Sequence, residues 1–153
     1  MPPTSLALRT ALLLAGAAAA LGTGVSTALA STRGSLTSDD GTLNTGVGTY
    51  ADCSGRTPLQ SNEAAIDPCI SGRTYFLGHH AGVFTPLMHM HAGDHLTYTD
   101  GGGGHHRYLI VSTRDWMAAN GTAPVTQVDV SAQFQTCIKP DGSLDRIVDV
   151  VTE

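Results

Sequence analysis

The residues best suited to chemistry are a cysteine, a histidine and an arginine. Cys137 ends the run Gln133-Phe134-Gln135-Thr136-Cys137, His79 follows a glycine earlier in the chain, and Arg146 comes shortly after the cysteine. A thiolate can attack a carbonyl carbon, an imidazole can carry the proton, and a guanidinium can hold the oxyanion that forms. Together they predict acyl transfer through a thioester on Cys137. The alternatives are a small buried side chain at Cys137, a structural His79, and an exposed Arg146 paired with a neighbouring aspartate.

The first 30 residues have the pattern of a signal peptide. Arg9 is the lone charge before an apolar run at 11–22, and Ala28-Leu29-Ala30 offers small residues for cleavage before Ser31. The apolar run is shorter than the ~20 residues that a membrane helix needs. We therefore predict a secreted or cell-surface protein, with a retained N-terminal anchor as the alternative.

The rest of the chain has the size of one domain. Residues 31–45 are rich in Ser, Thr, Gly and Asp, which predicts a flexible linker, and 46–153 is expected to be a single domain with a real core. The chain has 8 Lys+Arg against 13 Asp+Glu and a formal net charge of −5. This balance argues against nucleic acid and anionic membranes as partners. We expect a monomer.

Three cysteines allow three choices of disulfide. Cys53 and Cys69 flank one short segment, and export permits a bridge between them. Either of the other two pairings would place Cys137, the candidate nucleophile, in a disulfide. We therefore predict a Cys53–Cys69 disulfide, and a closed loop of this size should add roughly 3 kcal/mol of stability.

The pattern between turns is typical of a mostly β protein. Strands are expected at 46–52, 73–78, 94–99, 107–113, 131–138 and 144–151, with a helical turn at 62–66 and a short helix or 3₁₀ turn near Pro86. Glycines at 101–104 and Pro140-Asp141-Gly142 are turn sequences. Short strands separated by such turn sequences predict a sandwich or a closed barrel.

The two-residue period of a strand indicates where Cys137 points. Gln135 and Cys137 share one face, and Phe134 and Thr136 share the other. If the apolar face is buried, Cys137 faces outward, toward solvent or a groove. An antiparallel neighbour across the following turn could bring Arg146 beside the thiol.

The same period favours one of two adjacent histidines. Tyr75, Leu77 and His79 share a face of the strand at 73–78, so that His79 rather than His80 continues the row. His80 is the alternative.

The order of these motifs resembles the sortases, the cysteine transpeptidases of Gram-positive cell surfaces. Thr136-Cys137 matches the end of their Thr-Leu-x-Thr-Cys pattern, whereas Gln133 and Phe134 depart from it. The other matches are Gly78-His79 at a strand end, Phe84-x-x-Leu87, Gly93-Asp94 opening a strand, and Arg146. The resemblance covers roughly residues 74–151.

The resemblance implies a single sortase-like closed β-barrel with short helices or 3₁₀ turns, forming a catalytic domain over 46–153. It implies a catalytic set of His79, Cys137 and Arg146, with Gln135 and Thr136 contacting the substrate. A peptide or protein with a sorting-type motif would be cleaved, and the thioester would pass to an amine of the cell wall or a pilin, or to water. No cofactor or metal is implied.

Two other functions stay open. A caspase-like peptidase shares the His-before-Cys order, but the signature Gln-Ala-Cys-x-Gly is absent, because the sequence at 135–139 lacks both the Ala and the Gly. The second is a non-catalytic secreted binding module, either a degenerate sortase fold or a metal-binding surface protein. Its soft or borderline ligands would be Met88-His89-Met90-His91, His95 and His105-His106. No spacing among them matches a closed metal site, so we expect none.

Overall fold

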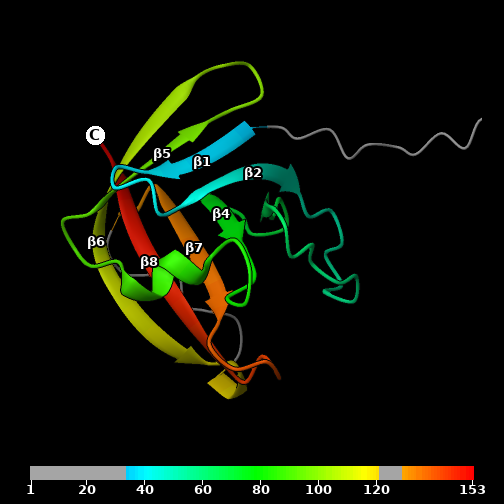
Figure 1. Cartoon of the computed structure of the whole chain (residues 1–153). Helices are drawn as coiled ribbons and strands as arrows, with labels where there is room; N and C mark the ends of the chain where they lie inside the picture. The colour runs from blue at the N-terminus through cyan, green and yellow to red at the C-terminus, as the bar shows by residue number, and fades with distance from the viewer. Residues whose placement is uncertain (1–33, 121–128) are drawn as a thin grey trace, which may run out of the picture.

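The structure is a computed structural model that describes residues 34–120 and 129–153. The elements are β1 (Gly34–Ser38), β2 (Asn44–Thr49), β3 (Ala64–Ile66), β4 (Thr74–Leu77), η1 (Thr85–His89), β5 (His95–Thr99), β6 (His105–Met117), η2 (Ala118–Asn120), β7 (Ala132–Cys137) and β8 (Leu144–Thr152). Figure 1 shows the strands wrapping around one centre. The predicted signal peptide, 1–30, lies outside the described residues, among which no helix is long and apolar enough to cross a membrane.

The strands form a closed barrel. Their order is β1-β2-β3-β4-β7-β8-β6-β5, and β5 pairs back with β1. The pairs β2–β3 and β4–β7 are parallel, and the other neighbours are antiparallel. The predicted mostly β fold, the closed barrel and the 3₁₀ turn near Pro86 are confirmed. Closure leaves none of the eight described strands at a free sheet edge, which protects the barrel from association through its strands.

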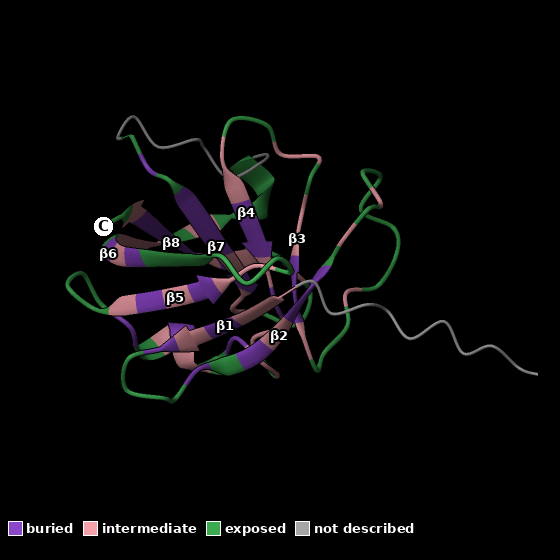
Figure 2. Ribbon diagram, turned by 90° about the horizontal axis from the view of Figure 1, so that it is seen from above, coloured by how far each residue is buried: buried purple, intermediate pink, exposed green. Residues whose placement is uncertain are grey.

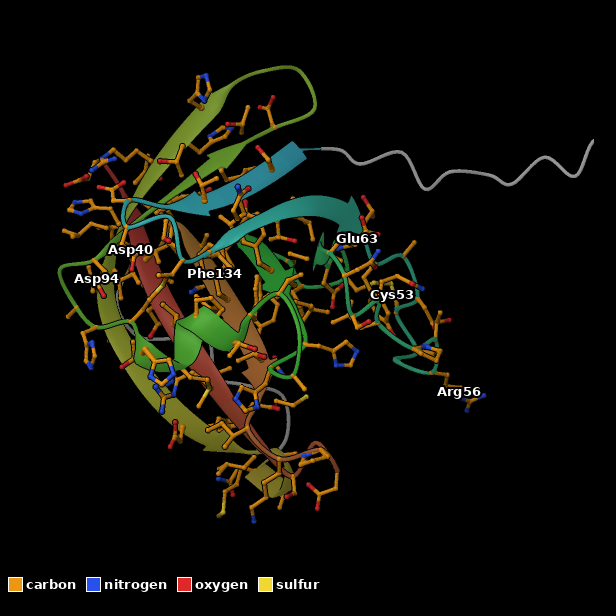
Figure 3. All side chains as sticks on the ribbon, viewed as in Figure 1. Asp40, Cys53, Arg56, Glu63, Asp94 and Phe134 are labelled. Carbon is orange, nitrogen blue, oxygen red and sulfur yellow. A yellow bond between two sulfur atoms is a disulfide. The ribbon has the colours of Figure 1, made fainter. Side chains whose placement is uncertain are left out.

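Aromatic rings fill the barrel and fix which face of each strand points inward. Phe76 of β4 and Phe134 of β7 are fully buried, and their rings stack with centroids 4.5 Å apart. Phe134 is labelled in Figure 3, and Figure 2 shows how buried segments line the barrel. Because side chains alternate along a strand, this packing turns Gln135 and Cys137 outward, as the sequence predicts.

Two local predictions are wrong. Residues 34–45 contain β1 and the start of β2 rather than a flexible linker, since Leu36 is fully buried in the core and β1 closes the barrel against β5. The expected helical turn at 62–66 is instead β3, which pairs with both β2 and β4. In both places pairing with distant strands overrides local composition.

Apart from β3, much of the segment from Cys53 to Cys69 stands away from the barrel. Figure 3 labels Cys53 and Arg56 on this excursion. Cys53 and Cys69 form the predicted disulfide. At the base of the loop the Asp52 carboxylate accepts three backbone N–H groups from residues 54–57. We call residues 53–69 the clamped segment, because both of its ends are held.

Gly78 is required by close packing rather than by its backbone angle. A Cβ atom at this position would lie 2.4 Å from the ring of Phe84, which packs edge-on to Phe134. We expect Gly78→Ala to lower the free energy of unfolding by about 1–3 kcal/mol through overpacking, measured by urea denaturation. Gly102→Ala, in an exposed turn, is the control and should cost less, because a Cβ atom there would lie 3.3 Å from the side chain of Asp100 rather than 2.4 Å from a buried ring. Equal effects of the two substitutions would contradict this explanation.

Candidate active site

Cys137 and His79 line the same pocket. Strands β4 and β7 run parallel with Leu77 opposite Gln135, so the next outward-facing residues are His79 and Cys137. A pocket of about 220 Å³ there is lined by His79, His80, Ala81, Cys137, Lys139 and Pro140. Cys137 is a free, half-buried thiol. The structure therefore brings the predicted nucleophile and base together, and it places both histidines at the pocket.

The clamped segment holds the His79 ring. His79 Nε2 lies 2.8 Å from the backbone carbonyl oxygen of Leu59. A carbonyl oxygen can only accept, so Nε2 carries the proton and Nδ1 has the free lone pair. A base held by an accepting group in this way keeps one tautomer and one orientation.

Arg146 does not lie beside Cys137, and that prediction is wrong. Arg146 pairs with Thr136 across the β7–β8 ladder, and Cys137 pairs with Asp145. Paired residues share a face, so Arg146 points to the side of Thr136. Its Nε donates to Asp115 Oδ1 at 2.6 Å. Thr136 is 1% exposed, which also rules out the predicted substrate contact from its side chain.

The residue opposite the thiol is Asp145, which the sequence interpretation considered only as a partner of Arg146. It is 6% exposed. Burial, followed by the negative charge and hydrogen bonding of Asp145, raises the pKa of the Cys137 thiol. Burial raises the pKa of the Asp145 carboxyl as well. The pocket therefore favours the protonated thiol when it holds no substrate.

Solved structures with a similar fold exist. Listeria monocytogenes sortase A aligns with a TM-score of 0.63 and 16% identity, over 80% of this chain and 87% of that one. A lid mutant of Corynebacterium diphtheriae sortase A aligns at 0.62 with 12% identity, over 80% and 70%. Streptococcus pneumoniae sortase C, an enzyme studied for its pilin substrate specificity, aligns at 0.64 with 13% identity, over 79% and 68%.

The chain has the sortase fold. No protein-family model and no curated protein sequence matches it. At these identities the likeness to known sortases concerns the arrangement of the barrel.

A separate groove lies on the outer face of the sortase-fold barrel, and Asp145, the residue paired with Cys137, lines it. It has a volume of about 390 Å³ and runs between the clamped segment and strands β4, β7 and β8. Tyr75 donates its hydroxyl hydrogen to Gln135 Oε1, and Gln135 Nε2 donates to Asp145 Oδ2 at 2.8 Å. Gln135, predicted to contact substrate, therefore lies in the groove. These hydrogen bonds fix the Asp145 carboxylate between the groove and the thiol.

A second buried carboxylate on this face is fully engaged. Asp149 accepts from Gln133 Nε2 at 2.7 Å, from Ser112 Oγ at 2.6 Å and from Arg114. The charge of Asp149 is balanced by Arg114, and the network joins β6, β7 and β8.

The histidines that suggested a metal site do not converge. Within residues 34–120 and 129–153, no group of three or more His, Cys, Asp or Glu residues could hold a metal ion. His95 interacts with Asp39 and Glu153, and His106 with Asp100. These are surface pairs at one end of the barrel, remote in the ladder from Cys137.

Removing the carboxylate opposite the thiol should make Cys137 more reactive. Asp145→Asn removes a negative charge that opposes thiolate formation, so the thiol pKa should fall and the thiolate fraction at neutral pH should rise. We expect iodoacetamide to modify Cys137 several-fold faster in the variant, as followed by intact mass spectrometry. Asp115→Asn, at the carboxylate that pairs with Arg146, is the control and should leave the rate unchanged. An unchanged rate in Asp145→Asn would show that the charge does not act on the thiol.

Proposed function

We propose that the protein is an exported cysteine transpeptidase or peptidase that acts on a peptide through a thioester on Cys137. The observation that supports this is the free thiol of Cys137 in one pocket with His79, at the ends of parallel strands in a barrel with the sortase fold. A thiol nucleophile with an oriented imidazole is the arrangement that acyl transfer requires.

In the proposed reaction His79 Nδ1 takes the proton of the Cys137 thiol, and the thiolate attacks the scissile carbonyl carbon. The tetrahedral intermediate collapses, the C–N bond breaks, and the imidazolium protonates the leaving amine. An incoming amine or water then gives its proton to Nδ1 and attacks the thioester. Collapse releases the new amide or acid and returns the thiol.

The oxyanion requires a donor other than Arg146, which faces away from the pocket. Lys139 lines the pocket beside Cys137 and supplies a positive charge on the correct side of the barrel. In this proposal Lys139 stabilises the oxyanion. The loss of such a donor commonly costs ~2.7–4 kcal/mol of transition-state stabilisation.

The proposed substrate is a peptide or protein with a sorting-type motif, and the proposed acceptor is an amine of the cell wall or a pilin. The resemblance of the motifs around Cys137 supports both, as does the fold shared with a sortase studied for pilin specificity. The signal-like sequence at 1–30 supports action outside the cytoplasm.

The decisive experiment is capture of the acyl-enzyme. The unreduced full chain is incubated with a Leu-Pro-x-Thr-Gly peptide, with and without a glycine-rich amine, and examined by intact and peptide mass spectrometry. We expect a thioester adduct on Cys137 that disappears when the amine is added, and a new amide product. Cys137→Ala should give neither. Absence of adduct and product across a panel of sorting-type peptides, with an intact fold, would refute the proposal.

A non-catalytic binding module is the second candidate, and one observation favours it. The thiol faces Asp145 rather than an arginine, which raises the thiol pKa and disfavours the nucleophilic form. A binding module predicts that Cys137 of the native chain reacts slowly or not at all with iodoacetamide at neutral pH. Rapid, stoichiometric labelling would favour the enzyme.

A further inference from the structure

Asp145 lines the outer groove, and one of its carboxylate oxygens is buried without a geometric hydrogen bond. The carboxylate interacts with two side chains among the described residues, Gln135, which donates to Oδ2, and the Cys137 thiol. Oδ1 is buried and has no partner at normal hydrogen-bond geometry. The residue is 6% exposed and lines the groove. A buried anion without a compensating partner is costly, and natural structures rarely keep one without a use.

The surrounding charges do not satisfy this oxygen. Asp67 is the other carboxylate of the groove, and no Lys or Arg is among the described residues that line it. Arg114 is bound to Asp149, and Arg146 is bound to Asp115 on the other side of the ladder. The part of the groove formed by described residues is therefore acidic, without a positive charge of its own.

Three large apolar side chains line the groove together with these carboxylates. Leu59 belongs to the clamped segment, Ile70 directly follows that segment, and Leu77 belongs to β4. An apolar wall leading to a buried carboxylate matches a long side chain with a cationic end, because the alkyl stem and the head need different surroundings. Neither a purely apolar nor an acidic side chain would satisfy both parts.

We propose that this groove binds a basic side chain, lysine or arginine, of the peptide substrate, with its cationic head at the Asp145 carboxylate and its alkyl stem against Leu59, Ile70 and Leu77. The inference rests on the proposed function in one respect only: the bound peptide is the one that reaches Cys137. The binding itself requires no chemistry at the thiol.

Binding in this position would couple recognition to reactivity. Asp145 faces both the groove and the thiol, so a cation placed on it offsets the charge that opposes thiolate formation. A peptide with a basic residue would thus favour the reactive form of Cys137 as it binds.

The test compares two peptides that differ only in the charged head. Acetyl-Ala-Lys-Ala-amide and acetyl-Ala-norleucine-Ala-amide are titrated into the unreduced full chain at neutral pH, and binding is followed by NMR chemical shifts. We expect the lysine peptide to bind about tenfold more tightly, which corresponds to about 1.4 kcal/mol. Asp145→Asn should remove this preference, and Asp115→Asn should retain it. Equal affinities in the native protein, or an unchanged preference in a folded Asp145→Asn, would overturn the proposal.

The Cys137→Ala variant separates this inference from the proposed function. It should retain the lysine preference, because the thiol does not contact the cation in the proposal. Lysine-selective binding without any acyl-enzyme in the native protein would uphold the groove and refute the enzyme. Acyl-enzyme formation without lysine selectivity would uphold the enzyme and refute the groove.

Discussion

His79→Ala should lower kcat/KM for peptide transfer by about 10²–10⁴-fold, because the imidazole moves the proton in both halves of the proposed reaction. His80→Ala should retain the rate within a few-fold, since it is the His79 ring that the Leu59 carbonyl orients. The measurement is initial rate against peptide concentration, with circular dichroism to establish that both variants are folded.

The two histidine variants control for each other. Both residues line the pocket, so a general disturbance of this loop would affect them alike. Retained activity in His79→Ala together with loss in His80→Ala would move the base by one residue. Equal, small losses in both variants would remove histidine from the mechanism.

Replacing Cys53 and Cys69 together with Ser should lower the free energy of unfolding by about 3 kcal/mol, because the bridge closes a loop with a sequence separation of 16. It should also slow transfer, since the Leu59 carbonyl would no longer be held against His79. Urea denaturation measures the first effect, and transfer rates at a temperature where the variant is fully folded measure the second.

These two effects can be separated. A stability loss of the expected size with an unchanged transfer rate would show that the clamped segment contributes to the fold but not to positioning of the base. Mild reduction of the native chain is the matched treatment, because it opens the same bridge and changes no residue. The double variant and the reduced protein should then behave alike.

The strands that carry the candidate site could be predicted from the sequence, because each has a clear alternation and a strong turn beside it. β4 and β7 were expected near their observed ends, and the apolar face of β7 correctly turned Cys137 outward. β1 and β3 could not be predicted, since they are short, polar or alanine-rich and are held by strands distant in the chain. Local composition contains no information about such partners.

The position of Arg146 depends on the register between β7 and β8. An error of one residue in register moves a side chain to the other face of the sheet, even when both strands are correctly assigned. A resemblance of motif order suggested that Arg146 would reach the thiol, but the ladder places Asp145 opposite Cys137. Counting outward from the turn at 139–143 pairs Ile138 with Leu144 and hence Cys137 with Asp145. The signal was present in the sequence, and a single-residue difference exchanged a cation for an anion beside the nucleophile.

The place of β7 and β8 in the barrel has a consequence for folding. This hairpin lies between β4 and β6, although both of those strands precede it in the chain. Until the hairpin pairs with them, the barrel is open and Cys137 is not beside the loop that carries His79. Closure of the barrel and assembly of the thiol pocket are therefore the same folding step.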